Sequence, residues 1–386
     1  MKACAAIAAG LLVLVAGAMT PVRAHDPVDI NVSFNREVVR IMQRKCESCH
    51  APGALSIPLT DYRDVRAWGR AIREELVEHR MPPAMVARGY GLYESDPSLN
   101  IRELETLLVW LDGGMPRGDE ADRPAPPAAA HQHADPSASV TIALPPQTVP
   151  AREALVVRRV TVDAGAAAGR AVARVELQPE NRRVLRGARV FAEEPVSASA
   201  RATADKQAGP HVLRWLGAWL PWQHAIAPPA THAFHVPAGG RFTVELYYRG
   251  ADAEQVDRSA IVVTLAGATA PGRVDDLVLD ATARSATQAR GRVQLREATT
   301  IWALYPAIDA SVTAMELRAE RPDGAVDVLM WIPQARAEWP VALVMRQPLE
   351  LPAGTTVSLI AETTGTNAAA TPRVALSVLR ATPPSR

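Results

Sequence analysis

Residues 46–50 read Cys46-Glu47-Ser48-Cys49-His50, which is a C-x-x-C-H pattern. Two thiols three residues apart on one helical turn can add to the two vinyl groups at one edge of a haem, and the next residue brings an imidazole to the iron. The pattern therefore predicts one covalent haem c (heme c), bound through Cys46 and Cys49, with His50 as the proximal axial ligand. A C-x-x-C redox dithiol beside an unrelated histidine is disfavoured, because no βαβ pattern surrounds the motif.

Helical periodicity surrounds this motif. The first predicted helix covers residues 35–49, and its apolar stripe places the cysteines at its C-terminal end. A second starts after Asp61, a suitable N-cap, and a third starts at Asn100, where Glu103 can complete a capping box. Their apolar positions are Val38, Val39, Met42 and Cys46, then Tyr62, Val65, Trp68, Ile72 and Leu76, then Ile101, Leu104, Leu108 and Leu111. We therefore expect residues 25–120 to form a small all-α domain around the haem.

The loop after the second predicted helix offers a sixth ligand for the iron. It contains Met81 followed by two prolines, which stiffen the chain there. We predict Met81 as the distal axial ligand, because a thioether opposite His50 raises the reduction potential and so suits an electron relay. The alternatives are Met85 and His79, and His79 would give a bis-histidine haem of lower potential.

The N-terminus predicts export. An apolar run after Met1-Lys2 leads to a small-residue cleavage site at Val22-Arg23-Ala24, so residues 1–24 are predicted to be a signal peptide. Haem c is attached on the oxidising side of bacterial membranes, which agrees with a periplasmic or exported protein. A retained N-terminal anchor is the alternative. No later apolar run approaches about 20 residues, so we expect no transmembrane span after signal removal. The formal net charge is +1 and basic residues are scattered, which excludes an extended nucleic-acid surface.

The remaining chain is predicted to be a linker and then an all-β region. Residues 121–139 are rich in proline and alanine, and we assign no metal to their H-x-H pair, His131 and His133, because the segment is poor in ligands. Short alternating apolar runs follow and predict two β-sandwiches, residues 140–270 and 271–386. The clearest runs cover 154–162, 173–177, 242–248, 260–265, 357–361 and 374–379.

Two family resemblances extend this prediction. The segment from Phe34 to about Asp119 resembles bacterial cytochrome c domains, with matching residues Cys46, Cys49, His50, Trp68, Arg80, Met81, Pro82, Pro83, Trp110, Asp112 and Gly113. The β region resembles the copper type II monooxygenase fold of peptidylglycine α-hydroxylating monooxygenase, through phrases at 175–181, 219–222, 236–239, 321–324 and 351–356. The resemblances imply a multidomain chain: a small all-α cytochrome c domain followed by an all-β region of two jelly-roll-like sandwiches.

The copper ligands implied by the second resemblance are missing. The monooxygenase family holds two coppers mainly by imidazoles, whereas this chain has other residues at the matching positions, 186–187, 247–248 and 307–309. The last of its nine histidines is His235, so the second sandwich has none. We therefore expect no copper, with His224, His232 and His235 as weak candidates.

These observations together predict a periplasmic monohaem c-type cytochrome for electron transfer. Its copper-free, monooxygenase-like β region would serve docking or assembly, and its partners would be a redox protein donor and acceptor. A haem with both axial ligands occupied has no open position, so we expect no oxygen chemistry. The alternatives are a copper-dependent monooxygenase that uses the haem as electron donor, and a structural haem subunit of a larger respiratory or extracellular complex.

Overall fold

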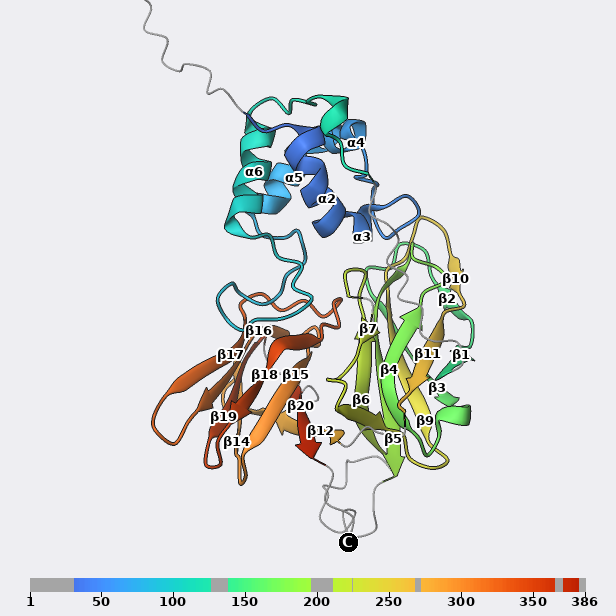
Figure 1. Cartoon of the computed structure of the whole chain (residues 1–386), viewed down its shortest axis with the longest axis vertical. Coiled ribbons are helices and arrows are strands. Elements are labelled where there is room, and N and C mark those ends of the chain that lie inside the picture. The colour runs from blue at the N-terminus through green and yellow to red at the C-terminus, as the bar shows by residue number, and fades with distance from the viewer. Residues whose placement is uncertain are drawn as a thin grey trace, which may run out of the picture.

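The computed structural model describes residues 31–125, 138–195, 211–223, 225–267, 272–364 and 371–381 (Figure 1). The predicted signal peptide at 1–24, the pair His131 and His133, and His224 lie outside these described residues. So does the predicted boundary between the two sandwiches near residue 270.

The α-helices of the described residues all lie before residue 113 and form what we call the helical segment. Cys46 has a φ of −120°, outside the helical range, and therefore splits the first predicted helix into two. The second is split at Trp68, which caps both halves. The elements are the π-helical turn η1 (Phe34–Val38), α2 (Val39–Lys45), α3 (Glu47–His50), α4 (Tyr62–Ala67), α5 (Gly69–Val77), α6 (Ile101–Asp112) and the 3₁₀ turn η2 (Glu120–Asp122).

The predicted helix starts are confirmed. The Asp61 carboxylate accepts a hydrogen bond from the backbone N–H of Asp64 at 3.0 Å, and Asn100 and Glu103 form both halves of a capping box. Two predicted apolar positions are wrong: Trp68 is 46% exposed and Ile101, the first residue of α6, is 67% exposed. Trp68 has a φ of −95° and a ψ of 5°, outside the helical range, so the apolar stripe does not continue through this residue.

The helical segment has a small core of its own. Trp110 is fully buried, lies 5.9 Å from the ring of Phe34, and donates its indole N–H to the carbonyl of Pro116 at 2.9 Å. Cys46 and Leu104 pack against this core, which includes Leu99. The cysteine motif is thus attached directly to the apolar centre of the segment.

The first β-sandwich has two layers. One layer has the order β1 (Ser139–Ala143), β11 (Ala260–Leu265), β4 (Ala171–Gln178) and β8 (His232–His235), with β7 (Ala225–Ile226) also paired to β4. The other has the order β3 (Val156–Asp163), β9 (Arg241–Tyr248), β5 (Leu185–Pro195) and β6 (His211–Trp219). A 3₁₀ turn η4 (Gly165–Ala167) and a small ribbon of β2 (Gln147–Val149) and β10 (Gln255–Asp257) complete this sandwich.

The second β-sandwich has the same plan. One layer has the order β12 (Gly272–Asp280), β20 (Arg373–Ala381), β15 (Thr299–Ala307) and β18 (Leu343–Leu351). The other has the order β13 (Thr282–Ala283), β14 (Gln288–Gln294), β19 (Thr356–Thr363), β16 (Val312–Glu320) and β17 (Val326–Ile332). A short parallel pairing of β8 with β12 joins one layer of each sandwich into a continuous sheet.

The helical segment and the second sandwich are joined by residues 85–96. Met85 and Tyr93 are buried in the core of the second sandwich, at 5% and 6% exposure. Tyr93 forms an antiparallel bridge with Met345 of β18, and the Tyr93 hydroxyl donates to the carbonyl of Leu329. Figure 1 shows this cyan loop descending from the helices onto the orange and red strands.

These contacts correct the predicted fold class. The predicted small all-α cytochrome c domain followed by an all-β region of two jelly-roll-like sandwiches is wrong, because the described chain is mostly β and no separate cytochrome domain is evident. The physical reason is that the segment's helices are short, and the loop between α5 and α6 contributes its apolar side chains to a β core. The β-sandwich part of the prediction is confirmed by the strand pairing.

Within the described residues, no helix is both long enough and apolar enough to cross a bilayer.

Candidate functional site

The cysteine motif forms a single helical turn. The carbonyl of Cys46 accepts the backbone N–H groups of Cys49 and His50 at 3.1 and 3.0 Å. Both cysteines have free thiols and are half-buried. The turn therefore holds two unpaired thiols and an imidazole within five consecutive residues, as covalent haem attachment requires.

The thiols are not activated as nucleophiles. Burial raises the pKa of Cys46 to about 12 and that of Cys49 to about 11. Charges on Arg182 and Arg186 lower the pKa of Cys49 but do not outweigh burial. Since a redox dithiol needs at least one thiol with a lowered pKa, the folded site does not favour that alternative.

His50 is oriented for metal binding. Its Nδ1 lies 2.8 Å from the carbonyl oxygen of Ile57, which can only accept, so Nδ1 carries the proton and Nε2 keeps its lone pair. Burial also lowers the pKa of His50, which favours the neutral imidazole. A ring fixed in this tautomer by a backbone carbonyl is the usual arrangement of a metal-ligating histidine.

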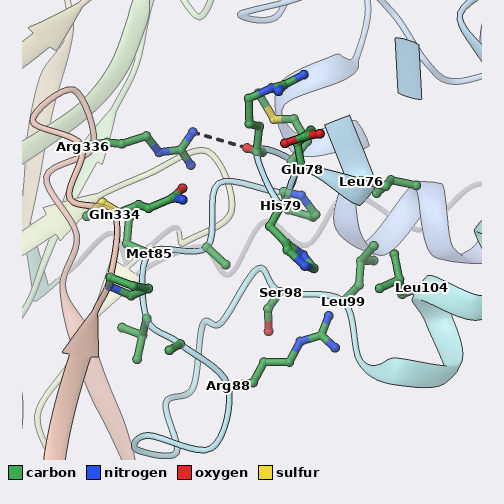
Figure 2. Close-up of a pocket in the computed structure, with 17 residues that line it drawn as sticks. Leu76, Glu78, His79, Met85, Arg88, Ser98, Leu99, Leu104, Gln334 and Arg336 are labelled. Atoms are coloured by element: carbon green, nitrogen blue, oxygen red, sulfur yellow. Dashed lines mark hydrogen bonds between the residues drawn. The ribbon is translucent and has the colours of Figure 1, made fainter. Parts of the chain in front are cut away.

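The candidate distal ligands line one cavity. Its volume is about 550 Å³, within the roughly 300–1,000 Å³ typical of ligand pockets. His79, Met81 and Met85 all contribute to its wall, with Met81 39% exposed and Met85 5% exposed. Figure 2 shows His79 and Met85 on the same cavity, the first from the end of the helices and the second from the loop toward the β strands.

The structure brings the motif near this cavity without placing it in the wall. Cys46, Cys49 and His50 are not among the lining residues, but Leu99 and Leu104 both line the cavity and belong to the apolar cluster against which Cys46 packs. The residues present fit a haem in their thiol spacing and in the His50 tautomer, and three candidates for a second iron ligand line the nearby cavity.

Arginines from both sandwiches meet the helical segment here, and sequence reasoning missed them. Arg182 donates to the carbonyl of Ser48 at 3.3 Å, between the two cysteines. Arg336, in the loop after β17, donates to the carbonyl of Arg80 at 3.3 Å across the cavity. The Arg186 guanidinium lies 5.3 Å from the ring centroid of Trp339. Position 186 was noted in the sequence only because it lacks an expected copper ligand, and nothing marked Arg182 or Arg336, because single arginines are ordinary.

The weak copper candidates do not converge. His232 and His235 lie at the two ends of β8, and residues three apart on a strand point to opposite faces. The Nδ1 of His232 lies 2.9 Å from the hydroxyl of Thr231, and His235 is exposed. His224 lies outside the described residues. Among the residues that the structure describes, no three His, Cys, Asp or Glu side chains are grouped as metal ligands would be.

Comparisons with known proteins identify no family. No family model matches the chain, and no curated protein matches it. Among solved structures, the major capsid protein P2 from bacteriophage PM2 is 9% identical, with 64% of this chain and 99% of that chain covered at a TM-score of 0.26. PNGF-II is 8% identical, with 64% and 66% covered at a TM-score of 0.27. The STIV MCP is 9% identical, with 63% and 97% covered at a TM-score of 0.25. Similarities this weak carry no argument about function.

The predicted family resemblance is therefore corrected. A bacterial cytochrome c domain fused to a copper type II monooxygenase-like double β-sandwich is contradicted by the absence of any family match and by a mostly β chain with no cytochrome domain evident. The phrases that suggested the resemblance are short, and turn sequences such as P-D-G recur in unrelated β proteins because they suit tight turns.

Proposed function

We propose that this chain binds one haem c covalently through Cys46 and Cys49, with His50 as the proximal ligand, and transfers electrons. The observation that carries the proposal is the hydrogen bond from His50 Nδ1 to the Ile57 carbonyl, at 2.8 Å, directly after two free thiols on one turn. It leaves Nε2 available to an iron. A bound haem supplies reversible one-electron chemistry at that iron.

The distal ligand that we propose is Met81. It lines the cavity and is partly exposed, so its thioether can reorient without disrupting a packed core. Met85 is buried in the second β core, where withdrawing it would leave a void. If His50 and Met81 both held the iron, it would have no open position, and this would favour electron transfer over oxygen chemistry.

Export belongs to the same proposal. Haem c attachment requires the oxidising side of the membrane, and the predicted signal peptide at 1–24 would bring the chain there. Its partners would be a redox protein that donates electrons and another that accepts them. The sandwiches would then provide surfaces for docking or assembly.

The experiment is expression of the full chain, with its own N-terminus, in a host that matures c-type cytochromes. We expect haem to remain on the chain after denaturation, and metal analysis to find about one iron and no stoichiometric copper. The variant with Cys46→Ser and Cys49→Ser should lose covalent haem, whereas Ser48→Ala, which keeps both thiols, should retain it. A chain without covalent haem, or one with two coppers, contradicts the proposal.

A further inference from the structure

Partly buried positive charge without an ion-pair partner among the described residues lies where the helical segment meets the two sandwiches. Arg186 is the second residue of β5 in the first sandwich, and Arg336 lies in the loop after β17 of the second. Burial lowers the pKa of both guanidinium groups. The Nε atom of Arg186 is buried and has no hydrogen-bond partner, and neither arginine is in an ion pair among the described residues.

Nearby acids do not neutralise this charge. Glu338 raises the pKa of both arginines without forming an ion pair with either in the described chain. Glu75 also raises the pKa of Arg336, but its carboxylate is paired with Arg80 at 3.0 Å. Arg249 adds further positive charge near Arg186. Two partly buried cations sharing one acid are costly, and an anion bound between them would offset the cost.

The two arginines flank the site proposed for the haem. Arg336 lines the cavity, and Figure 2 shows it extending from the β side toward the helical segment, where its hydrogen bond is drawn as a dashed line. Arg186 is not in the cavity wall, but its guanidinium lies 5.3 Å from the ring centroid of Trp339, whose backbone N–H donates to the carbonyl of Arg336 at 3.2 Å. The charge of Arg186 also lowers the pKa of Cys49. The uncompensated charge therefore extends from the cavity wall toward the attachment motif.

We propose that Arg186 and Arg336 bind the two propionate carboxylates of the haem, so that both sandwiches form part of the cofactor site. This inference rests on the proposed function. Guanidinium groups bind carboxylates through paired, charge-assisted hydrogen bonds, and a haem carries two carboxylates at the edge away from its vinyl groups. A haem held in this way would lie between the helical segment and the β region.

The charge of these arginines should be measurable in the reduction potential. The oxidised haem carries one more positive charge than the reduced haem, so a nearby guanidinium favours reduction. Arg186→Gln and Arg336→Gln should each lower the ferrous-to-ferric ratio at fixed ambient potential by about fourfold to sixteenfold, for charges roughly 10 Å apart at an effective dielectric of about 20–40. A tenfold change corresponds to about 59 mV for a one-electron couple.

A variant that removes a negative charge distinguishes an effect of charge from damage to the fold. Glu338→Gln removes the shared acid and should raise the reduction potential, whereas damage to the fold would not change the potential in opposite directions for opposite charges. Arg186→Lys and Arg336→Lys keep the charge and should stay near the unmodified value. Arg318→Gln is the matched control, because Arg318 is exposed and paired with Glu316 on the same strand, and it should cause no shift.

The experiment measures the midpoint potential and the covalent haem content of each full-length variant. An unchanged potential in the Arg186→Gln and Arg336→Gln double variant, or a decrease in Glu338→Gln, overturns the arginine proposal. If the glutamine variants do not take up haem, the reduction potentials of the lysine variants and of Glu338→Gln test the arginine proposal. Absence of covalent haem from the unmodified chain contradicts the proposed function instead, so the two failures are distinguishable.

Discussion

Asp276 should make the contact between the two sandwiches dependent on pH. Its carboxylate, on β12, accepts the backbone N–H of Trp215 on β6 at 2.7 Å and the hydroxyl of Ser377 at 3.1 Å. Burial raises the pKa of Asp276 to about 6, although these hydrogen bonds and the charge of Arg214 lower it. The other groups that affect this pair of sheets are Asp275, which raises the pKa of Asp276, and the buried Tyr305, whose own pKa Asp276 raises.

Because its pKa is raised, Asp276 stabilises the fold in its protonated form. The folded state binds the Asp276 proton more tightly than the unfolded chain, where the pKa is about 3.9. The stabilising contribution is therefore complete below about pH 4, is lost as the pH rises toward 6, and is absent above that. Because the pKa rises from about 3.9 to about 6 and each tenfold change in proton affinity is worth about 1.4 kcal/mol, this contribution to the free energy of unfolding is roughly 3 kcal/mol.

The test compares the unmodified chain with Asp276→Asn. An asparagine cannot ionise, but its carbonyl can still accept from Trp215 and its amide can donate to Ser377. We expect urea titrations to show that the variant gains stability relative to the unmodified chain as the pH rises. The gain in the free energy of unfolding should be about 3 kcal/mol between pH 4 and pH 7. Ser377→Ala removes a donor that lowers the Asp276 pKa and should extend the pH-dependent range upward. A difference that stays constant from pH 4 to pH 7 would refute this reasoning.

Two further predictions concern the cavity and its support. Met81→Ala should lower the reduction potential of the haem-loaded chain and abolish the long-wavelength absorption band of methionine-ligated ferric haem. Met85→Ala should keep this band. The reverse result would identify Met85 as the ligand. Tyr93→Ala should destabilise the chain by about 3–5 kcal/mol in urea titrations, since a buried ring is lost. Tyr93→Phe removes only the hydrogen bond to the Leu329 carbonyl and should lower the free energy of unfolding by about 0.5–1.5 kcal/mol. Equal losses of stability in the two variants would contradict the packing argument.

The β strands were predictable because their information is local. Period-two alternation fixes which residues face a sheet, and the run expected at 260–265 has the bounds of β11, Ala260–Leu265. The capping residues Asp61 and Asn100 were predictable for the same reason, because a cap depends on neighbours within one turn. The breaks at Cys46 and Trp68 were not, since a continuous apolar stripe does not reveal where packing interrupts a helix.

Of the candidate site, only the C-x-x-C-H motif could be identified from the sequence. The C-x-x-C-H motif indicates a haem from five consecutive residues, but the arginines at 186 and 336 come from different sandwiches and are brought together by the fold. The packing of residues 85–96 could not be predicted either. Met85 and Tyr93 lie between two predicted helices in the sequence, but they are buried in a β core. Long-range burial of this kind leaves no local pattern in the sequence.

The position of the two arginines relative to each other depends on contacts far from the cavity. Arg186 belongs to the first sandwich and Arg336 to the second, and the described contacts that hold the sandwiches together include the β8–β12 pairing, the Asp276 hydrogen bonds and the bond from Arg189 to the Pro306 carbonyl at 2.8 Å. The helical segment is held to the second sandwich by Tyr93, which forms an antiparallel bridge with Met345 of β18. If an anion binds between the arginines, it must draw these parts together, because a ligand that binds only the folded arrangement stabilises it. Haem loading should therefore raise the stability of the β region as well as that of the helical segment.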